Sequence, residues 1–278
     1  MNFFNQHVSE THIRLKDRLW LYIIAFLVLF LLIVPSLVVI PMSFSDSQYL
    51  EFPPKNWSLR WYENYFSSGK VGMGFNDWIG ATWTSVKVAV LTIFVATPIG
   101  TMAAYGLINS GSRVRTILFP IMISPMMVPV ILVAIGLFYF YVQLKMVNSI
   151  LGLVLGHSLV AMPLVLIIVL SALKNYDMNQ EKVARSLGAS RLRAFFEITL
   201  PQIKFSIISA SLISFLTSFD EVIISLFVAG GDNSTITRAM FLALRDQIDP
   251  TIAAISTILI IISTGLLIIV QLFGTKKD

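Results

Sequence analysis

The sequence predicts an all-α membrane protein with six transmembrane helices. Hydrophobic residues make up 56% of its 278 residues and charged residues only 13%, which is far from the balance of an ordinary soluble domain. The apolar residues gather into six runs, each close to the roughly 20 residues that a helix needs to cross a bilayer. The basic residues concentrate in a few connecting segments, as in proteins that are oriented in a membrane.

The six predicted spans are separated by polar connections of very different length. Their approximate bounds are Leu19–Pro41, Trp83–Ile108, Ile117–Val142, Ile150–Leu173, Phe205–Ala229 and Ile252–Phe273. The first run follows three basic residues, as in a signal peptide, but it is too long and lacks a small-residue cleavage site. We therefore expect it to be retained as a helix. Prolines inside the runs are tolerated when neighbouring helices satisfy the backbone, and they often mark kinks.

The distribution of Lys and Arg predicts the orientation in the membrane. Thirteen lie on one side: Arg14, Lys16, Arg18, Arg113, Arg115, Lys174, Lys182, Arg185, Arg191, Arg193, Lys204, Lys276 and Lys277. Six lie on the other side: Lys55, Arg60, Lys70, Lys145, Arg238 and Arg245. Because cytoplasmic segments carry the excess of basic residues, both termini are expected in the cytoplasm.

This orientation divides the chain into segments with expected locations. Residues 1–18 form a cytoplasmic tail, 19–273 a single transmembrane domain, and 274–278 a second cytoplasmic tail. Within the domain, a loop at about 174–202 is cytoplasmic and a loop at about 43–76 is outside. The outer loop contains an aromatic string, Trp57–Tyr65, which is typical of a short amphipathic helix at the membrane interface.

The cytoplasmic run Glu181–Pro201 predicts two short helices joined by a turn. Asn175 or Asp177 can cap the first helix and Ser190 the second. Gly188 stands where the end of a helix requires a positive φ. By spacing alone this is a solvated helical hairpin, and in a soluble protein the same pattern would suggest a DNA-binding helix-turn-helix.

In a membrane protein, the same run resembles the EAA loop of permease subunits of type I ABC importers. That family has Glu-Ala-Ala, three residues, Gly, nine residues, then Ile-x-Leu-Pro. Here Ala184, Gly188, Ile198, Leu200 and Pro201 match this pattern. The first two positions differ, because Lys182 replaces the Glu and Val183 replaces the first Ala. Glu181 lies one residue early, so the salt bridge usually assigned to the family's Glu is not carried over to it.

The resemblance implies that this loop is a coupling helix that docks into a cleft on a separate ATPase subunit. The docking residues that it implies are Glu181, Lys182, Val183, Ala184, Arg185, Gly188, Ala189, Ile198, Leu200 and Pro201. Small residues suit such docking, because nothing bulky holds the two surfaces apart. The sequence contains no phosphate-binding loop of the Gly-x4-Gly-Lys-Ser/Thr type, so ATP hydrolysis is expected on the partner and not on this chain.

Two further segments are similar to permeases of the spermidine/putrescine class. One is FPPKNWSLRWYENY in the outer loop, and the other is a Phe-Asp-Glu segment before a Gly-rich turn, within Ser218–Phe241. The resemblance implies a five-helix permease core and transport by alternating access in a bacterial inner membrane. It also implies three partners, namely an ATPase dimer, a second and different permease subunit, and an extracytoplasmic solute-binding protein. No cofactor and no metal are expected.

Asp220 and Glu221 are the candidate pathway residues. They lie inside the fifth predicted span, where a carboxylate near the bilayer centre costs on the order of 2.5–3.5 kcal/mol. At least one is therefore expected to face a wet cavity or a cation. A carboxylate in the pathway would suit a polyamine or another small cationic solute, whereas a salt bridge to the second permease is the structural alternative.

Other functions and solutes stay open at this point. A secondary transporter normally shows internal repeats, which this sequence lacks. A membrane-embedded enzyme needs a polar cluster, and besides the two carboxylates only Lys87 and His157 are ionisable well inside the spans. His157 is expected to be hydrogen-bonded to a neighbouring helix. Related permeases carry opines, aminophosphonates or ferric iron.

Overall fold

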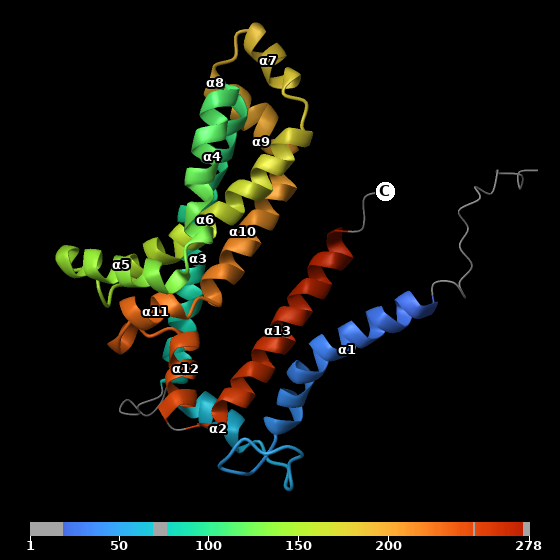
Figure 1. The fold of residues 1–278 in the computed structure, drawn as a ribbon, viewed down its shortest axis with the longest axis vertical. Coiled ribbons are helices and arrows are strands. Elements are labelled where there is room, and N and C mark those ends of the chain that lie inside the picture. The colour runs from blue at the N-terminus through green and yellow to red at the C-terminus, as the bar shows by residue number, and fades with distance from the viewer. Residues whose placement is uncertain (1–18, 69–76, 247, 275–278) are drawn as a thin grey trace, which may run out of the picture. The chain divides into compact units, whose positions relative to one another are not determined.

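The computed structural model describes residues 19–68, 77–246 and 248–274 (Figure 1). The expected tails, 1–18 and all but the first residue of 274–278, lie outside these residues. The described helices are α1 (Leu19–Met42), α2 (Arg60–Ser67), α3 (Trp78–Asn109), α4 (Ser112–Met127), α5 (Val130–Leu144), α6 (Ile150–Asn175), α7 (Asn179–Ser186), α8 (Arg191–Ala194), α9 (Leu200–Gln202), α10 (Lys204–Phe219), α11 (Ile223–Val228), α12 (Ile236–Asp246) and α13 (Thr251–Gly274). A π-helical segment, Phe195–Thr199, joins α8 to α9, and Gly231–Asn233 is a single 3₁₀ turn. The described part of the chain contains no strand.

Each of the six predicted spans contains helix. By length and composition, α1, α3 and α6 can each cross a membrane. The total becomes five if two bent helix pairs each count as one span. These pairs are α4 with α5, and Arg191–Gln202 with α10. The sixth predicted span lies in α13, a helix of 24 residues. The fold class that the sequence predicts, an all-α membrane protein, is confirmed.

Two of the predicted spans are broken rather than continuous. Ile117–Val142 is divided between α4 and α5, which are bent by 94°. The break falls at Val128, which adopts extended backbone before Pro129, as residues that precede a proline prefer. Phe205–Ala229 is interrupted after α10, and α11 begins at Ile223. The interruption contains both candidate pathway carboxylates.

Residues 66–247 form one compact unit built on α3, α6 and α10. These three helices pack closely because small residues line their crossings. A Cβ atom added at Gly100 of α3 would lie 2.7 Å from a methyl group of Val165 on α6. The core around this crossing contains Leu166 and Val169 of α6 and Ala210 of α10, all fully buried.

The other compact unit combines the described residues 19–65 with 248–274. Within it, α1 contacts α13. Most side chains of α1 are exposed, as expected for a helix whose surroundings are lipid or other subunits. The segment between α1 and α3 contains the predicted short helix, α2, with Trp61 buried. Asn64 of α2 donates a hydrogen bond to Thr251 Oγ1 at the start of α13, with a length of 2.8 Å.

Candidate functional site

The loop between α6 and α10 consists of two short helices with a turn between them, as predicted. Asp177 Oδ1 accepts a hydrogen bond from the Asn179 backbone N–H (3.0 Å), so Asp177 and not Asn175 supports the start of α7. Gly188 ends α7 with a φ of +96°. Ser190 Oγ accepts from the Arg193 N–H (3.2 Å) and caps α8. Local sequence therefore fixes the ends of both helices.

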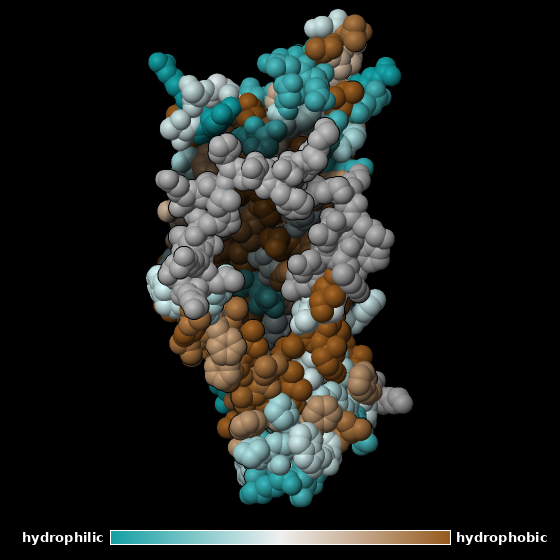
Figure 2. All heavy atoms as spheres, turned by 90° about the vertical axis from the view of Figure 1, so that its right-hand side faces the viewer, coloured by the Kyte–Doolittle hydropathy of each residue, from teal (hydrophilic) through white to brown (hydrophobic). Residues whose placement is uncertain are grey.

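The surface of this loop combines exposed apolar side chains with basic ones. Leu187 is 85% exposed, Leu192 is 72% exposed and Val183 is 59% exposed. The basic side chains of Lys182, Arg185, Arg191 and Arg193 are exposed beside them. Figure 2 shows hydrophilic residues with hydrophobic ones among them at its upper end, where Figure 1 places α7 and α8. Exposed apolar residues gathered in this way typically mark a protein interaction site.

Glu181 is turned away from this surface. Its side chain is only 2% exposed, although it belongs to the predicted docking loop. The hydroxyl of Tyr105 on α3 donates to Oε1 at 2.5 Å, and the hydroxyl of Thr199 donates to Oε2 at 2.6 Å. Sequence reasoning missed both partners, because neither residue type nor spacing links position 105 to position 181.

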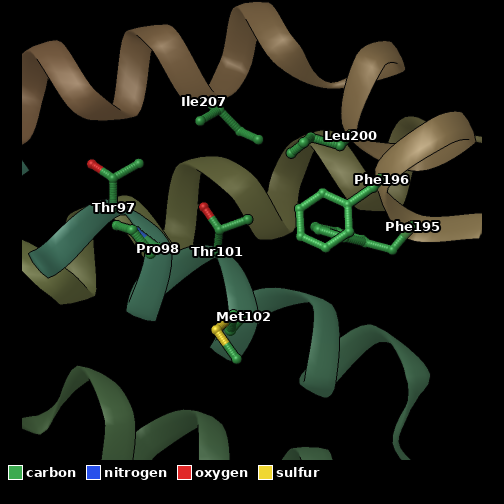
Figure 3. Close-up of a pocket in the computed structure, with 8 residues that line it drawn as sticks. All are labelled: Thr97, Pro98, Thr101, Met102, Phe195, Phe196, Leu200 and Ile207. Carbon is green, nitrogen blue, oxygen red and sulfur yellow. The ribbon is translucent and has the colours of Figure 1, made fainter. Parts of the chain in front are cut away.

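A small apolar pocket lies between α3 and the π-helical segment (Figure 3). Its volume is about 260 Å³. On one side it is lined by α3, and on the other by the π-helical segment and the helices that follow it. The lining residues are Thr97, Pro98, Thr101, Met102, Phe195, Phe196, Leu200 and Ile207. At its edge, the rings of Phe195 and Tyr105 are in contact, with centroids 4.7 Å apart.

The break between α10 and α11 places Asp220 and Glu221 in different environments. Glu221 Oε1 accepts a hydrogen bond from the Ile224 backbone N–H (3.0 Å) and so caps the start of α11. Asp220 is the residue that follows the last turn of α10, and its side chain is exposed. In the described part of the chain, its carboxylate makes no hydrogen bond and no ion pair.

His157 of α6 holds the two sides of this break together. Its side chain is buried, and Nδ1 lies 2.9 Å from Ser218 Oγ at the end of α10. Nε2 lies 3.2 Å from Ser225 Oγ in α11. The predicted hydrogen bond from His157 to a neighbouring helix is therefore confirmed, and the histidine has no ring nitrogen left for a ligand.

Comparison with known proteins decides the family. Residues 96–277 match the family described as "Binding-protein-dependent transport system inner membrane component". The chain belongs to this family. The matched range includes both the loop between α6 and α10 and the α10–α11 break, so this loop belongs to a transport permease.

Relatives of the permease narrow its class. It is 27% identical over 253 residues to the spermidine/putrescine transport system permease protein PotC of Haemophilus influenzae, which covers 91% of this chain and 95% of that protein. It is 29% identical over 248 residues to the putrescine transport system permease protein PotI of Escherichia coli, with coverages of 87% and 85%. The permease resembles the polyamine class of ABC importers, as its sequence predicts.

A solved structure confirms the fold. It is the crystal structure of a bacterial ABC transporter involved in the import of the acidic polysaccharide alginate, and it matches with a TM-score of 0.65 at 15% identity. The match covers 95% of this chain and 98% of that chain. The chain is thus a multi-pass, non-catalytic subunit of a binding-protein-dependent importer. Its family implies ATPase, solute-binding and second-permease partners.

The predicted docking residues of the permease are not equally accessible. Exposed side chains or backbone are found at Lys182, Val183, Arg185, Gly188 and Pro201. Partly buried positions are Ala184, Ala189, Ile198 and Leu200. Glu181 alone is buried. Among the described residues, His, Asp and Glu form no cluster of three that could hold a metal ion.

Proposed function

We propose that this permease forms half of the translocation pathway of an ATP-driven importer for polyamines or similar small cationic solutes. The observation that carries this proposal is the free carboxylate of Asp220 at a helix break within a predicted span. A charge at that depth is costly unless it meets water or a cation. The C-terminal end of α10 adds the partial negative charge of its last carbonyl groups beside the same carboxylate.

The fold by itself does not select the charge of the solute. The solved structure with this fold belongs to a transporter involved in the import of an acidic polysaccharide. Side chains must therefore decide between cationic and anionic solutes. The names of the two relatives, which concern spermidine and putrescine, favour a cation. Opines, aminophosphonates and ferric iron are the alternative solutes, and a gradient-driven transporter is the alternative mechanism.

The loop between α6 and α10 is proposed to lie in the cytoplasm and to dock on an ATPase subunit. Its apolar side chains offer area to bury, and its basic side chains favour a cleft with acidic groups at the rim. Within α8 and the π-helical segment, one salt bridge offsets a basic residue: the Glu197 carboxylate lies 3.0 Å from Arg193 Nε.

We further propose an ATPase dimer, a different second permease and an extracytoplasmic solute-binding protein as partners. Both termini are proposed to be cytoplasmic, with residues 19–273 as one transmembrane domain in the bacterial inner membrane.

The two carboxylates allow a matched test of the pathway. Asp220→Asn keeps shape and removes charge, so uptake of labelled putrescine should fall at least several-fold while the complex stays assembled. Glu221→Gln keeps an oxygen that can accept from the Ile224 N–H, so it should retain most uptake. Uptake and subunit composition are measured on the same membranes.

Two outcomes would contradict the cation pathway. If Asp220→Asn and the double variant both transport normally, no carboxylate is needed for a cation to pass. If Asp220→Asn instead dissociates the complex, the carboxylate is paired with a buried cation of the second permease, because breaking such a pair costs about 3–5 kcal/mol.

A further inference from the structure

Glu181 connects three parts of the permease through one carboxylate. The residue belongs to α7 of the cytoplasmic loop. One of its hydrogen-bond donors, Tyr105, lies near the end of α3, and the other, Thr199, lies in the π-helical segment that leads towards α10. The loop is thus bonded both to a long apolar helix and to the segment that follows it in the chain.

The two hydroxyls are the polar partners of this carboxylate in the described part of the chain. Glu181 forms no ion pair there, and Thr199 is fully buried. A buried carboxylate that loses a donor is strongly destabilised, since water cannot replace the lost hydrogen bond. This requirement makes Tyr105 and Thr199 move with Glu181 rather than separate from it.

The pocket between α3 and the π-helical segment makes the Glu181 hydrogen bonds more important for connecting these two elements. The side chains of α3 and those of the π-helical segment face each other across the pocket of about 260 Å³ (Figure 3). Met102 stands on the α3 side, and Phe196 and Leu200 on the other. A cavity forfeits close contacts between its walls, so it transmits displacement poorly. The Phe195–Tyr105 ring contact and the Glu181 hydrogen bonds bridge the gap at its edge.

We propose that Glu181, Tyr105 and Thr199 form a joint that passes movement of the docked loop to α3. The joint rests on the proposed docking of this loop to an ATPase. In this role Glu181 is a positioning residue that faces the membrane helices, while the exposed residues around it contact the partner. A displacement of α7 then pulls on the inner part of α3 and on the start of the α9–α10 segment together.

Three substitutions test the joint without changing side-chain size much. Tyr105→Phe and Thr199→Val each remove one hydroxyl that donates to Glu181, whereas Thr199→Ser keeps a hydroxyl at that position. In liposomes that contain the complete transporter, the first two variants should lower the amount of solute imported per ATP hydrolysed by several-fold. Thr199→Ser should keep the wild-type ratio, and the ATPase subunits should remain bound in all variants. Thr116→Val is the control, because that hydroxyl donates only within its own helix, to the Ser112 carbonyl.

A second measurement does not require the ATPase. In membranes that contain the permease, trypsin cleaves after exposed basic residues such as Lys182 and Arg185. Loosening the joint should accelerate this cleavage several-fold in Tyr105→Phe and Thr199→Val, but not in Thr116→Val. Unchanged cleavage together with an unchanged import ratio would overturn the joint. Loss of ATPase binding in the two variants would also overturn it, since the hydroxyls would then shape the docking surface. Failure of the wild-type permease to bind any ATPase would contradict the proposed docking instead. The cleavage rates of the variants would still show whether the hydrogen bonds of Glu181 hold the loop.

Discussion

At the level of single residues, the neighbouring carboxylates of Asp220 and Glu221 have different roles in this permease. Glu221 is held by the backbone N–H of Ile224, whereas Asp220 has an exposed carboxylate without a described partner. Because a helix start offers N–H groups without intrahelical acceptors, the side chain that accepts from one stabilises the helix. The same reasoning assigns Glu221 to local structure and leaves Asp220 available for a solute.

This assignment predicts a difference in stability between two Glu221 variants. Glu221→Ala removes the acceptor for the Ile224 N–H and should lower the free energy of unfolding by about 1 kcal/mol. Glu221→Gln retains an acceptor oxygen and should stay close to the wild type. Thermal unfolding of the purified permease in detergent measures both. Equal stability of the two variants would show that the hydrogen bond does not matter.

At the scale of elements, the loop between α6 and α10 exposes the apolar side chains that we propose to dock, while its Glu181 is buried. Gly188 joins the two helices with a φ of +96°, and a Cβ atom added there would meet no atom within 4 Å. A larger residue at this position therefore meets backbone strain and any docked partner, but no neighbour within the chain. That isolation makes Gly188 the position from which to probe docking.

Gly188→Trp should leave membrane insertion intact and reduce transport and stimulated ATP hydrolysis together. The strain of a positive φ costs about 1–2 kcal/mol locally, and the indole would occupy the partner's cleft. Gly111→Trp is the matched control, because Gly111 has equally open surroundings and no positive φ. ATPase retained on affinity-purified permease is quantified beside both activities. Normal ATPase binding and normal transport in Gly188→Trp would remove this loop from the interface.

The sequence predicts those elements best whose cause is local. The caps at Gly188 and Ser190 depend on residues a few positions away, and they are found as expected. Pro129 favours a kink in the third predicted span, but it does not predict the size of the bend, which is 94° between α4 and α5. The burial of Glu181 has no local signal, because its partner Tyr105 is 76 residues distant in the chain. Long-range polar contacts of this kind depend on which helices pack together. The hydrophobic pattern of the sequence predicts the helices but not their packing partners.

At the scale of the whole molecule, the orientation in the membrane is a prediction from the charge distribution. A reporter that is active only in the cytoplasm should function after Asp278 and when inserted near Ser190. It should be inactive near Ser67, which belongs to the predicted outer side. Activity of reporters at these three positions in intact cells checks the arrangement. An inactive reporter near Ser190, with one active near Ser67, would show the opposite orientation. The loop between α6 and α10 would then lie on the side of the membrane without ATP.

ATP-driven import of a small cation can be measured as uptake into liposomes that contain the complete transporter and its binding protein. Labelled putrescine should enter only when ATP is supplied to the loop side. Unlabelled spermidine should suppress this uptake, whereas 1,4-butanediol, which has the same carbon chain without charges, and the dianion succinate should not. Putrescine uptake without ATP would contradict an ATP-driven importer, and ATP-dependent uptake that succinate suppresses and spermidine does not would contradict a cationic solute.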